Sequence, residues 1–154
     1  MAVSFLDSSA LAKRYMIETG TGWVRTLTDL SSGNQCWLVA ITAVEVVTAF
    51  YRKARTGSHP LTAVQQAEAE FRNELTTHFR RLAVSSAILD EAMRLAATHP
   101  LRAYDAVQLG AAIVLQRRRA SRGWPSLTFI SADQNLNQMA ATEGLSVDDP
   151  NQHP

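Results

Sequence analysis

The chain has 154 residues, 46% of them hydrophobic and 19% charged, which describes one folded domain and excludes an intrinsically disordered chain. Its formal net charge of +1 identifies no class of partner; 13 of the 15 basic residues are arginine, a bias that suits bidentate phosphate contacts but that GC-rich genomes also produce. The single cysteine, Cys36, excludes a disulfide within the chain and argues against a cysteine–histidine zinc site.

The first predicted elements are a buried strand and a helix. Ala2–Leu6 is a short apolar run typical of a strand, and Asp7 follows at its carboxyl end. Ser8 or Ser9 is suited to cap a helix that runs to about Ile17. The N-terminus lacks the basic region of a signal peptide, and no apolar run approaches the roughly 20 residues of a membrane span. We therefore expect a cytoplasmic protein.

The next strand and helix place a second acid beside an apolar run. After a predicted helix over Thr21–Leu30, Cys36–Ile41 is again typical of a buried strand. Thr42 and Glu45 have the spacing of a capping box, in which a hydroxyl and an acid bond to the first free N–H groups of a helix. This helix is predicted to end near Arg55.

The remaining elements continue the alternation of strands and helices. Helices are predicted over Leu61–Arg80, Ser85–Thr98 and Arg102–Arg119, then over a short segment that ends at Gly144, with strands over Leu82–Val84, Leu127–Ile130 and Leu145–Val147. Such alternation favours an α/β fold with a central, mostly parallel sheet and helices on both faces, a three-layer α/β/α sandwich. We expect one domain over residues 1–147 and a polar tail over residues 148–154.

Four acids touch strongly apolar runs: Asp7, Glu45, Asp105 and Asp133. Ionised carboxylates are rarely buried unless they are paired or bound to a metal. Each acid has a local explanation as a helix cap or a first-turn residue, and capping does not exclude a role in a site. Caps alone do not explain why three of them follow strands, at the edge where parallel sheets bind ligands. We predict that the carboxylates gather there, with Asp105 joining them if its helix points that way.

A set of carboxylates of this kind is suited to a hard divalent cation. Mg²⁺ and Mn²⁺ take oxygen ligands, and Mg²⁺ usually keeps several waters. A bound metal lowers the pKa of a water, orients it on a phosphorus atom and offsets charge on the leaving oxygen. This chemistry requires no histidine ligand, and the four histidines of the chain show no ligand spacing.

The four acidic stretches resemble the motifs of the PIN domain, and most of all those of VapC-type toxins of bacterial toxin–antitoxin pairs. FLDSSALAKRY resembles the first motif of that family, ITAVEVVTAFYR the second, LRAYDAVQLGAA the third and SADQNL the fourth. The resemblance extends from about Val3 to Leu145, and no acid of the pattern is substituted.

This resemblance implies a Rossmann-like, PIN-like sandwich and an endoribonuclease that uses Mg²⁺ or Mn²⁺ to activate the water that attacks RNA. It further implies a homodimer and a small antitoxin protein as inhibitor. Transferred residue by residue, it makes four residues the catalytic, metal-binding acids: Asp7, Glu45, Asp105 and Asp133. Ser9 and Ser131 become polar neighbours that hold waters or phosphate oxygens, or that only cap their helices.

Basic residues near the acids are candidates for contacts with the RNA backbone. We predict this role for three residues: Lys13, Arg14 and Arg102. A denser cluster, Arg117–Arg119 with Arg122, is also explained by the dipole at a helix end, and at roughly 20 Å from Asp105 it would be a remote contact. The resemblance places the antitoxin against helices, which makes the region Ser58–Arg80 the expected partner surface.

Three other functions compete with the endoribonuclease. A non-catalytic PIN-fold module that binds RNA or protein would have no reason to keep all four acids. A phosphoryl-accepting hydrolase needs a second aspartate two residues after the first, where this chain has Ser9. A receiver domain needs a late lysine, whereas no lysine follows Lys53. The endoribonuclease is the leading hypothesis.

Overall fold

The centre of the molecule is a five-stranded sheet in which every neighbouring pair of strands is parallel. The computed structural model describes residues 1–154. Its strands are β1 (Val3–Leu6), β2 (Gln35–Val39), β3 (Arg80–Leu82), β4 (Thr128–Ile130) and β5 (Ser146–Asp148). They lie in the order β3-β2-β1-β4-β5. The predicted parallel sheet is confirmed.

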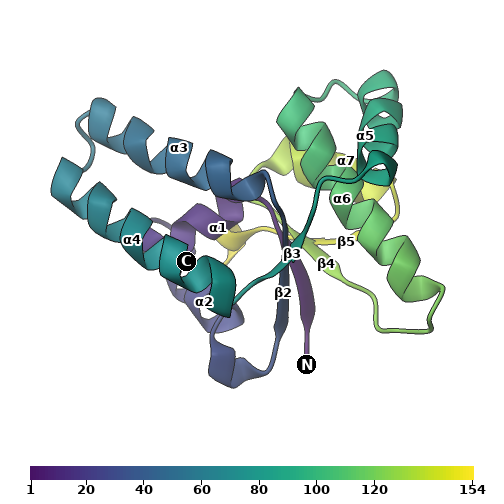
Figure 1. Ribbon diagram of the computed structural model, residues 1–154, viewed down its shortest axis with the longest axis horizontal. Helices are drawn as coiled ribbons and strands as arrows, with labels where there is room; N and C mark the ends of the chain where they lie inside the picture. Colours follow the sequence, from purple (N-terminus) through teal and green to yellow (C-terminus); the bar gives the residue numbers. More distant parts are fainter.

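Seven α-helices cover the two faces of this sheet (Figure 1). One side carries α1 (Ser8–Tyr15), α2 (Thr21–Leu27), α3 (Thr42–Arg55) and α4 (Leu61–Thr77), and the other carries α5 (Ser86–Thr98), α6 (Ala103–Ala120) and α7 (Gln134–Thr142). Two short 3₁₀ helices, η1 and η2, cover Leu30–Ser32 and Pro150–Gln152. This is the predicted three-layer sandwich. None of the helices combines the length and apolarity that crossing a membrane requires.

Alternation of side chains along the central strands supplies two separate cores. On β1, Phe5 packs toward α5, α6 and α7, whereas Leu6 packs toward α1 to α4. Phe129 and Ile130 of β4 divide in the same way. All four side chains are buried, and each contributes roughly 1.5–3 kcal/mol through the apolar surface it removes from water. The two central strands β1 and β4 therefore bury apolar side chains on both faces, as a covered parallel sheet requires.

The winding of the chain opens a crevice between β1 and β4. From β1 the chain moves outward through β2 to β3 and then crosses by α5 and α6 to β4, on the other side of β1. Connections that leave two adjacent strands in opposite directions separate beyond the carboxyl ends of those strands, where ligands bind in such sheets. The topology alone thus marks one edge of the sheet as the place for a site.

The third strand begins earlier than predicted. The helix expected over 61–80 ends at Thr77, and Arg80–Leu82 pairs in parallel with Trp37–Val39 of β2. Two arginines occupy this outer strand, and charged side chains are common on sheet edges because they discourage pairing with other molecules. A strand of this composition lacks the apolar run from which strands are predicted.

The segment 148–154, predicted as a polar tail, packs against the domain. Asp148 is the last residue of β5, and Pro150 is buried. His153 stacks on Trp23 of α2, with ring centroids 4.3 Å apart, and its Nε2 lies 2.8 Å from Asp148 Oδ1. The stacking of His153 on Trp23 joins residues far apart in the chain, so the polar composition of the segment does not reveal it.

Candidate active site

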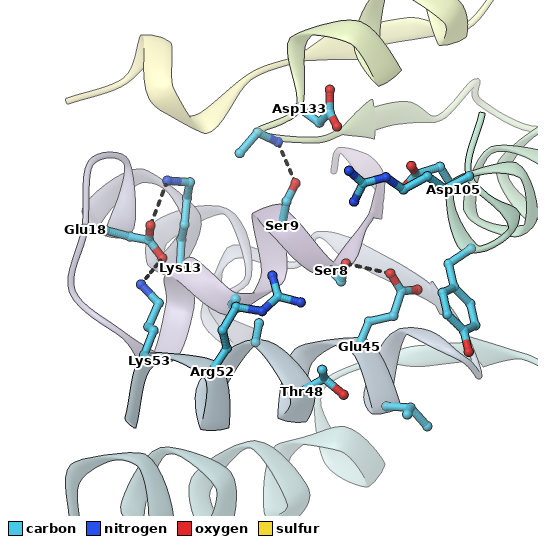
Figure 2. A pocket seen from close by; sticks show the side chains of 16 residues that line it. Ser8, Ser9, Lys13, Glu18, Glu45, Thr48, Arg52, Lys53, Asp105 and Asp133 are labelled. Atoms are coloured by element: carbon cyan, nitrogen blue, oxygen red, sulfur yellow. Dashed lines mark hydrogen bonds and ion pairs between the residues drawn. The ribbon is translucent and has the colours of Figure 1, made fainter. Parts of the chain in front are cut away.

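A pocket of about 670 Å³ lies beyond the carboxyl ends of β1 and β4, and α1, α3 and α6 contribute to its walls (Figure 2). Three of the four predicted acids line it, and Figure 2 shows them approaching from different elements: Glu45, Asp105 and Asp133. Asp105 reaches this edge because α6 leads into a parallel strand and therefore begins at the edge where the strands end. The helix of Asp105 thus points to the edge of the sheet, as the sequence analysis required for this acid to join the others.

All four acids lie at the start of a helix: Asp7 and Asp133 as N-caps, Glu45 and Asp105 in first turns. Asp7 Oδ1 accepts the N–H of Ala10 at 2.9 Å, and Asp133 Oδ1 accepts that of Leu136 at 3.1 Å. The N-cap of α1 is thus Asp7, whereas the sequence analysis had expected Ser8 or Ser9. Because four helix N-termini converge here, their dipoles offset part of the repulsion between the carboxylates.

Asp7 is the most deeply placed acid and does not itself line the pocket. Ser9 Oγ donates to its Oδ1 at 2.7 Å, and Ser131 Oγ donates to its Oδ2 at 2.8 Å. The two hydroxyls in turn accept the N–H groups of Ala132 and Asp133, at 2.9 and 3.0 Å. Asp7 therefore ties the end of β1 to the loop after β4, with Ser9 between it and the pocket.

The pKa values of three acids are raised, and each acid affects the next. Burial raises the pKa of Asp7 to about 6 in spite of its hydrogen bonds, and the charge of Glu45 adds to the rise. Burial also raises the pKa of Glu45, with a contribution from Asp105, and that of Asp105, with a contribution from Asp133. Arg102 is the one cation that opposes these shifts, by lowering the pKa of Asp105. The cluster thus carries negative charge that the protein does not neutralise.

Glu45 is held by neighbouring helices and not by a capping box. Its Oε1 accepts Gln108 Nε2 at 2.7 Å, and its Oε2 accepts Ser8 Oγ at 3.1 Å. Thr42 Oγ1 bonds to the same amide, accepting Nε2 at 2.9 Å, while Ile41 is the N-cap of α3 and supplies no side-chain cap. The predicted capping box is wrong, because α6 offers both side chains a buried amide.

Gln108 is the residue of this site that the sequence prediction missed. It lies three residues after Asp105, on the same side of α6, and is 1% exposed. Buried polar side chains nearly always have hydrogen-bond partners, so a lone amide within an apolar helix indicates a second polar group opposite it. That signal is present in AYDAVQLGAAI, but the sequence does not say which acid or hydroxyl is the partner.

Two of the three basic residues predicted to contact RNA line the pocket, Lys13 and Arg102. Lys13 is buried, and its Nζ lies 2.9 Å from the carbonyl oxygen of Thr19 and 3.5 Å from a carboxylate oxygen of Glu18. Its charge is therefore already engaged within the protein. Arg102, the N-cap of α6, is exposed and lies near the charge of Asp105.

The structure does not bring Arg14 to the pocket. Its guanidinium forms a bidentate pair with Glu74 of α4, at 2.7 and 2.8 Å, and donates to Thr28 Oγ1 at 2.9 Å. Adjacent helix positions point about 100° apart, and here Lys13 is directed to the pocket whereas Arg14 is directed to α4. This arginine joins α1 to α4 and does not line the pocket, and its contact with RNA stays a prediction.

The other predicted interaction surfaces also have internal contacts. In the distant arginine cluster, Arg117 pairs with Glu91 at 2.9 Å, and Arg119 is buried and donates to a backbone carbonyl at 2.7 Å. The expected partner region, Ser58–Arg80, contains the whole of α4, which packs on α3. Between these helices lies a small groove with apolar walls that include Val47 and Phe71.

The acids of the pocket offer only oxygen atoms, the donors that Mg²⁺ and Mn²⁺ prefer. No three acidic, histidine or cysteine side chains of the protein are grouped closely enough to hold an ion between them. Mg²⁺ commonly keeps several waters and is bound through one or two carboxylates, so a closed cage is not required. Asp105, whose carboxylate accepts no hydrogen bond, has free donor oxygens. The residues therefore fit a hydrated ion.

No protein-family model matches the sequence, and no curated protein matches it. Solved structures match its fold. FitAcB from Neisseria gonorrhoeae superposes with a TM-score of 0.63 at 16% identity, over 96% of this chain and 97% of that one. VapBC2 from Rickettsia felis, bound to a DNA fragment from their promoter, gives 0.63 at 10% identity, over 96% and 98%.

A third structure, VapC20 from Mycobacterium tuberculosis, is described as a sarcin-ricin loop cleaving toxin. It superposes with a TM-score of 0.60 at 17% identity, over 94% of this chain and 96% of that one. At such low identities the likeness establishes the fold, and it does so over nearly the full length of each chain. The protein has a PIN-domain fold of the VapC type.

Proposed function

We propose that this protein is a metal-dependent endoribonuclease, the toxin of a bacterial toxin–antitoxin pair, which hydrolyses RNA phosphodiester bonds. The observation that carries the proposal is the pocket in which Glu45, Asp105 and Asp133 converge without an ion-pair partner. Ionisable groups with shifted pKa values in a cleft are typical of functional sites. VapC20, a toxin that cleaves the sarcin-ricin loop, has the same fold and supports RNA as the substrate.

In this proposal a hydrated Mg²⁺ or Mn²⁺ is held at the pocket surface by one or two of the three carboxylates that line it: Glu45, Asp105 and Asp133. When bound, the cation supplies a water of lowered pKa and positive charge beside the leaving oxygen. Gln108 and Ser8 fix the orientation of the Glu45 carboxylate, so that it can orient the attacking water. Asp7 contributes negative charge from beneath the pocket and fixes Ser9 and Ser131.

The structural neighbours also suggest the partners that we propose. FitAcB and VapBC2 are antitoxin–toxin complexes, which supports an antitoxin as the partner of this chain. We also propose a homodimer. Leu89 and Met93 lie one turn apart on α5 and are 45% and 64% exposed, so this helix offers an apolar surface to a second copy.

The test is cleavage of bacterial RNA by the purified protein, with Mn²⁺ or Mg²⁺ and with EDTA, followed by mapping of the new RNA ends. We expect cleavage that EDTA removes. Asp105→Asn should lower the rate by about 10²–10³-fold, the usual loss for one group that stabilises the transition state. Asp90→Asn is the matched control, because Asp90 is exposed on α5 and forms no ion pair.

Two results would contradict the proposal in different ways. If Asp105→Asn cleaves RNA as fast as the wild type, the assignment of the site is wrong. If the wild type shows no metal-dependent cleavage but binds RNA or an antitoxin, the chain is the non-catalytic PIN-fold module that was the alternative function.

A further inference from the structure

The pocket has a basic half that the acids do not explain. Four cations line it: Lys13, Arg52, Lys53 and Arg102. Lys13 and Lys53 both lie 3.5 Å from Glu18, which neutralises part of their charge. The charge of Arg102 lowers the pKa of Asp105. Arg52 is exposed and pairs with no acid, and Figure 2 shows its guanidinium directed into the pocket.

Local sequence offers Arg52 no partner of its own. The positions three and four residues away on α3 are Thr48, Ala49, Arg55 and Thr56, none of them acidic. A cation in the last turn of a helix is favoured by the dipole, but Arg55 receives the same benefit without facing the pocket. The dipole therefore does not explain why one of the two arginines projects into the site.

One face of α3 runs from the acids to this cation. Glu45, Thr48 and Arg52 all line the pocket and follow the i, i+3, i+7 spacing of a helix stripe. At 1.5 Å per residue, Glu45 and Arg52 are separated by about 10 Å along the axis. Thr48 lies between them along the helix and is exposed, and in Figure 2 its side chain projects from the lower edge of α3. The upper side of α3 thus offers an acid and a guanidinium about two helical turns apart.

A polyanion that enters this pocket meets opposite charges at its two ends. The acidic end repels RNA unless a divalent ion is bound, so binding needs a separate cation that holds the strand beside the acids. Guanidinium groups form paired, charge-assisted hydrogen bonds with phosphate oxygens. Lys13 and Lys53 are partly neutralised by Glu18, which leaves Arg52 as the free group on α3.

We propose that Arg52 binds a phosphate of single-stranded RNA that neighbours the scissile phosphate, so that the strand lies along α3 between Arg52 and Glu45. Arg52 is then a substrate-positioning residue, and the inference rests on the proposed nuclease function. It assigns to the pocket a subsite for a backbone phosphate, which contacts no base and therefore carries no sequence preference.

The test compares Arg52→Gln with Arg55→Gln, which removes the same charge one turn away from the pocket. Binding of a fluorescein-labelled single-stranded RNA oligonucleotide is measured by anisotropy in EDTA, over a series of salt concentrations. We expect Arg52→Gln to weaken binding about tenfold and to reduce the slope of log K against log salt by about 0.7, the loss of one phosphate contact. Arg55→Gln should bind like the wild type.

Steady-state cleavage with Mn²⁺ supplies a second readout. Arg52→Gln should raise KM with kcat within about twofold, because the contact is the same in the substrate and in the transition state. Arg52→Lys should recover part of the affinity, since it keeps the charge but not the paired hydrogen bonds. The two glutamine variants should melt at the same temperature, because both lose the same dipole interaction.

The outcomes separate this inference from the function on which it rests. If the wild type cleaves RNA and the two glutamine variants bind it equally, Arg52 is not the phosphate subsite and the nuclease proposal stands. The same holds if Arg52→Gln keeps RNA affinity but loses an acidic protein partner. If the wild type neither binds nor cleaves RNA, both proposals fall together.

Discussion

Glu74 and Glu45 are both carboxylates in the half of the molecule built by α1 to α4, yet the fold treats them in opposite ways. Burial alone would raise the pKa of Glu74, but hydrogen bonds from Arg14 and Tyr15 outweigh it and the pKa is lowered. Burial raises the pKa of Glu45, and a bond from the neutral amide of Gln108 does not cancel the rise. The two pKa values shift in opposite directions because Arg14 lies beside Glu74, whereas no cation lies beside Glu45.

The other side of the sheet repeats the pattern. Glu91 is buried, and burial would raise its pKa, but ion pairs with Arg94 and Arg117 at 2.7 and 2.9 Å lower it. Asp105, on the adjacent helix, has no ion pair, and its pKa is raised. Paired acids of this kind join helices, whereas acids left without cations at the edge of the sheet remain available to a ligand.

The sharpest test of the comparison is to remove a paired acid. Glu74→Ala should lower the free energy of unfolding by about 3–5 kcal/mol, because Arg14 would then remain largely buried without its partner. Urea unfolding measures the change. Arg72→Ala is the control: it breaks an exposed pair with Glu68 on the same helix and should cost only about 0.3–0.5 kcal/mol. Equal losses in the two variants would show that the buried pair does not hold α4 in place.

Replacing Asp7, the acid beneath the pocket, should change the free energy of unfolding in the opposite direction. Asp7 has a pKa of about 6 in the folded protein against an ordinary value of 3.8, so folding favours its protonated form. This group stabilises the fold below its unfolded pKa, and that stability is lost as the pH rises through 6. Asp7→Asn should therefore raise the free energy of unfolding at pH 7.5, by about 2–3 kcal/mol. Asparagine keeps the capacity to cap α1.

Urea unfolding of the wild type and of Asp7→Asn at pH 4 and at pH 7.5 checks whether the change in the free energy of unfolding has this sign. The advantage of Asp7→Asn over the wild type should shrink toward zero at the lower pH, where aspartate is protonated. A smaller dependence of the same sign should remain in the variant, since the pKa values of Glu45 and Asp105 are also raised. A variant that is less stable than the wild type at pH 7.5 would mean that Asp7 is a net stabilising residue, like Glu74.

A divalent ion should act on the pocket acids and not on the paired ones. At about ten times its dissociation constant, Mn²⁺ should stabilise the fold by about 1.4 kcal/mol and raise the melting temperature by about 3–6 °C. Asp105→Asn should lose this shift, and Asp90→Asn should keep it. A shift that persists in Asp105→Asn would place the ion elsewhere on the molecule.

Much of the fold was predictable because its strands are apolar runs and its helices have clear ends. β1, β2 and β4 lie close to their predicted positions, and α3 ends at Arg55 as expected. The acids were found because carboxylates next to such runs are unusual. The prediction failed where a polar residue had a choice of partners, at Thr42 and Glu45, and it did not reveal that neighbouring basic residues face different ways, at Lys13 and Arg14.

The sequence by itself determined the alternation of strands and helices, the three-layer architecture and the presence of four acids beside apolar runs, three of them after strands. These are local properties, set by the period of apolar residues and by short-range chemistry. Only the tertiary structure decided which charges meet: that Arg14 neutralises Glu74, that Gln108 holds Glu45, and that Arg52 remains without a partner. Pairing between residues far apart in the chain depends on how helices are placed, and no local pattern records that placement.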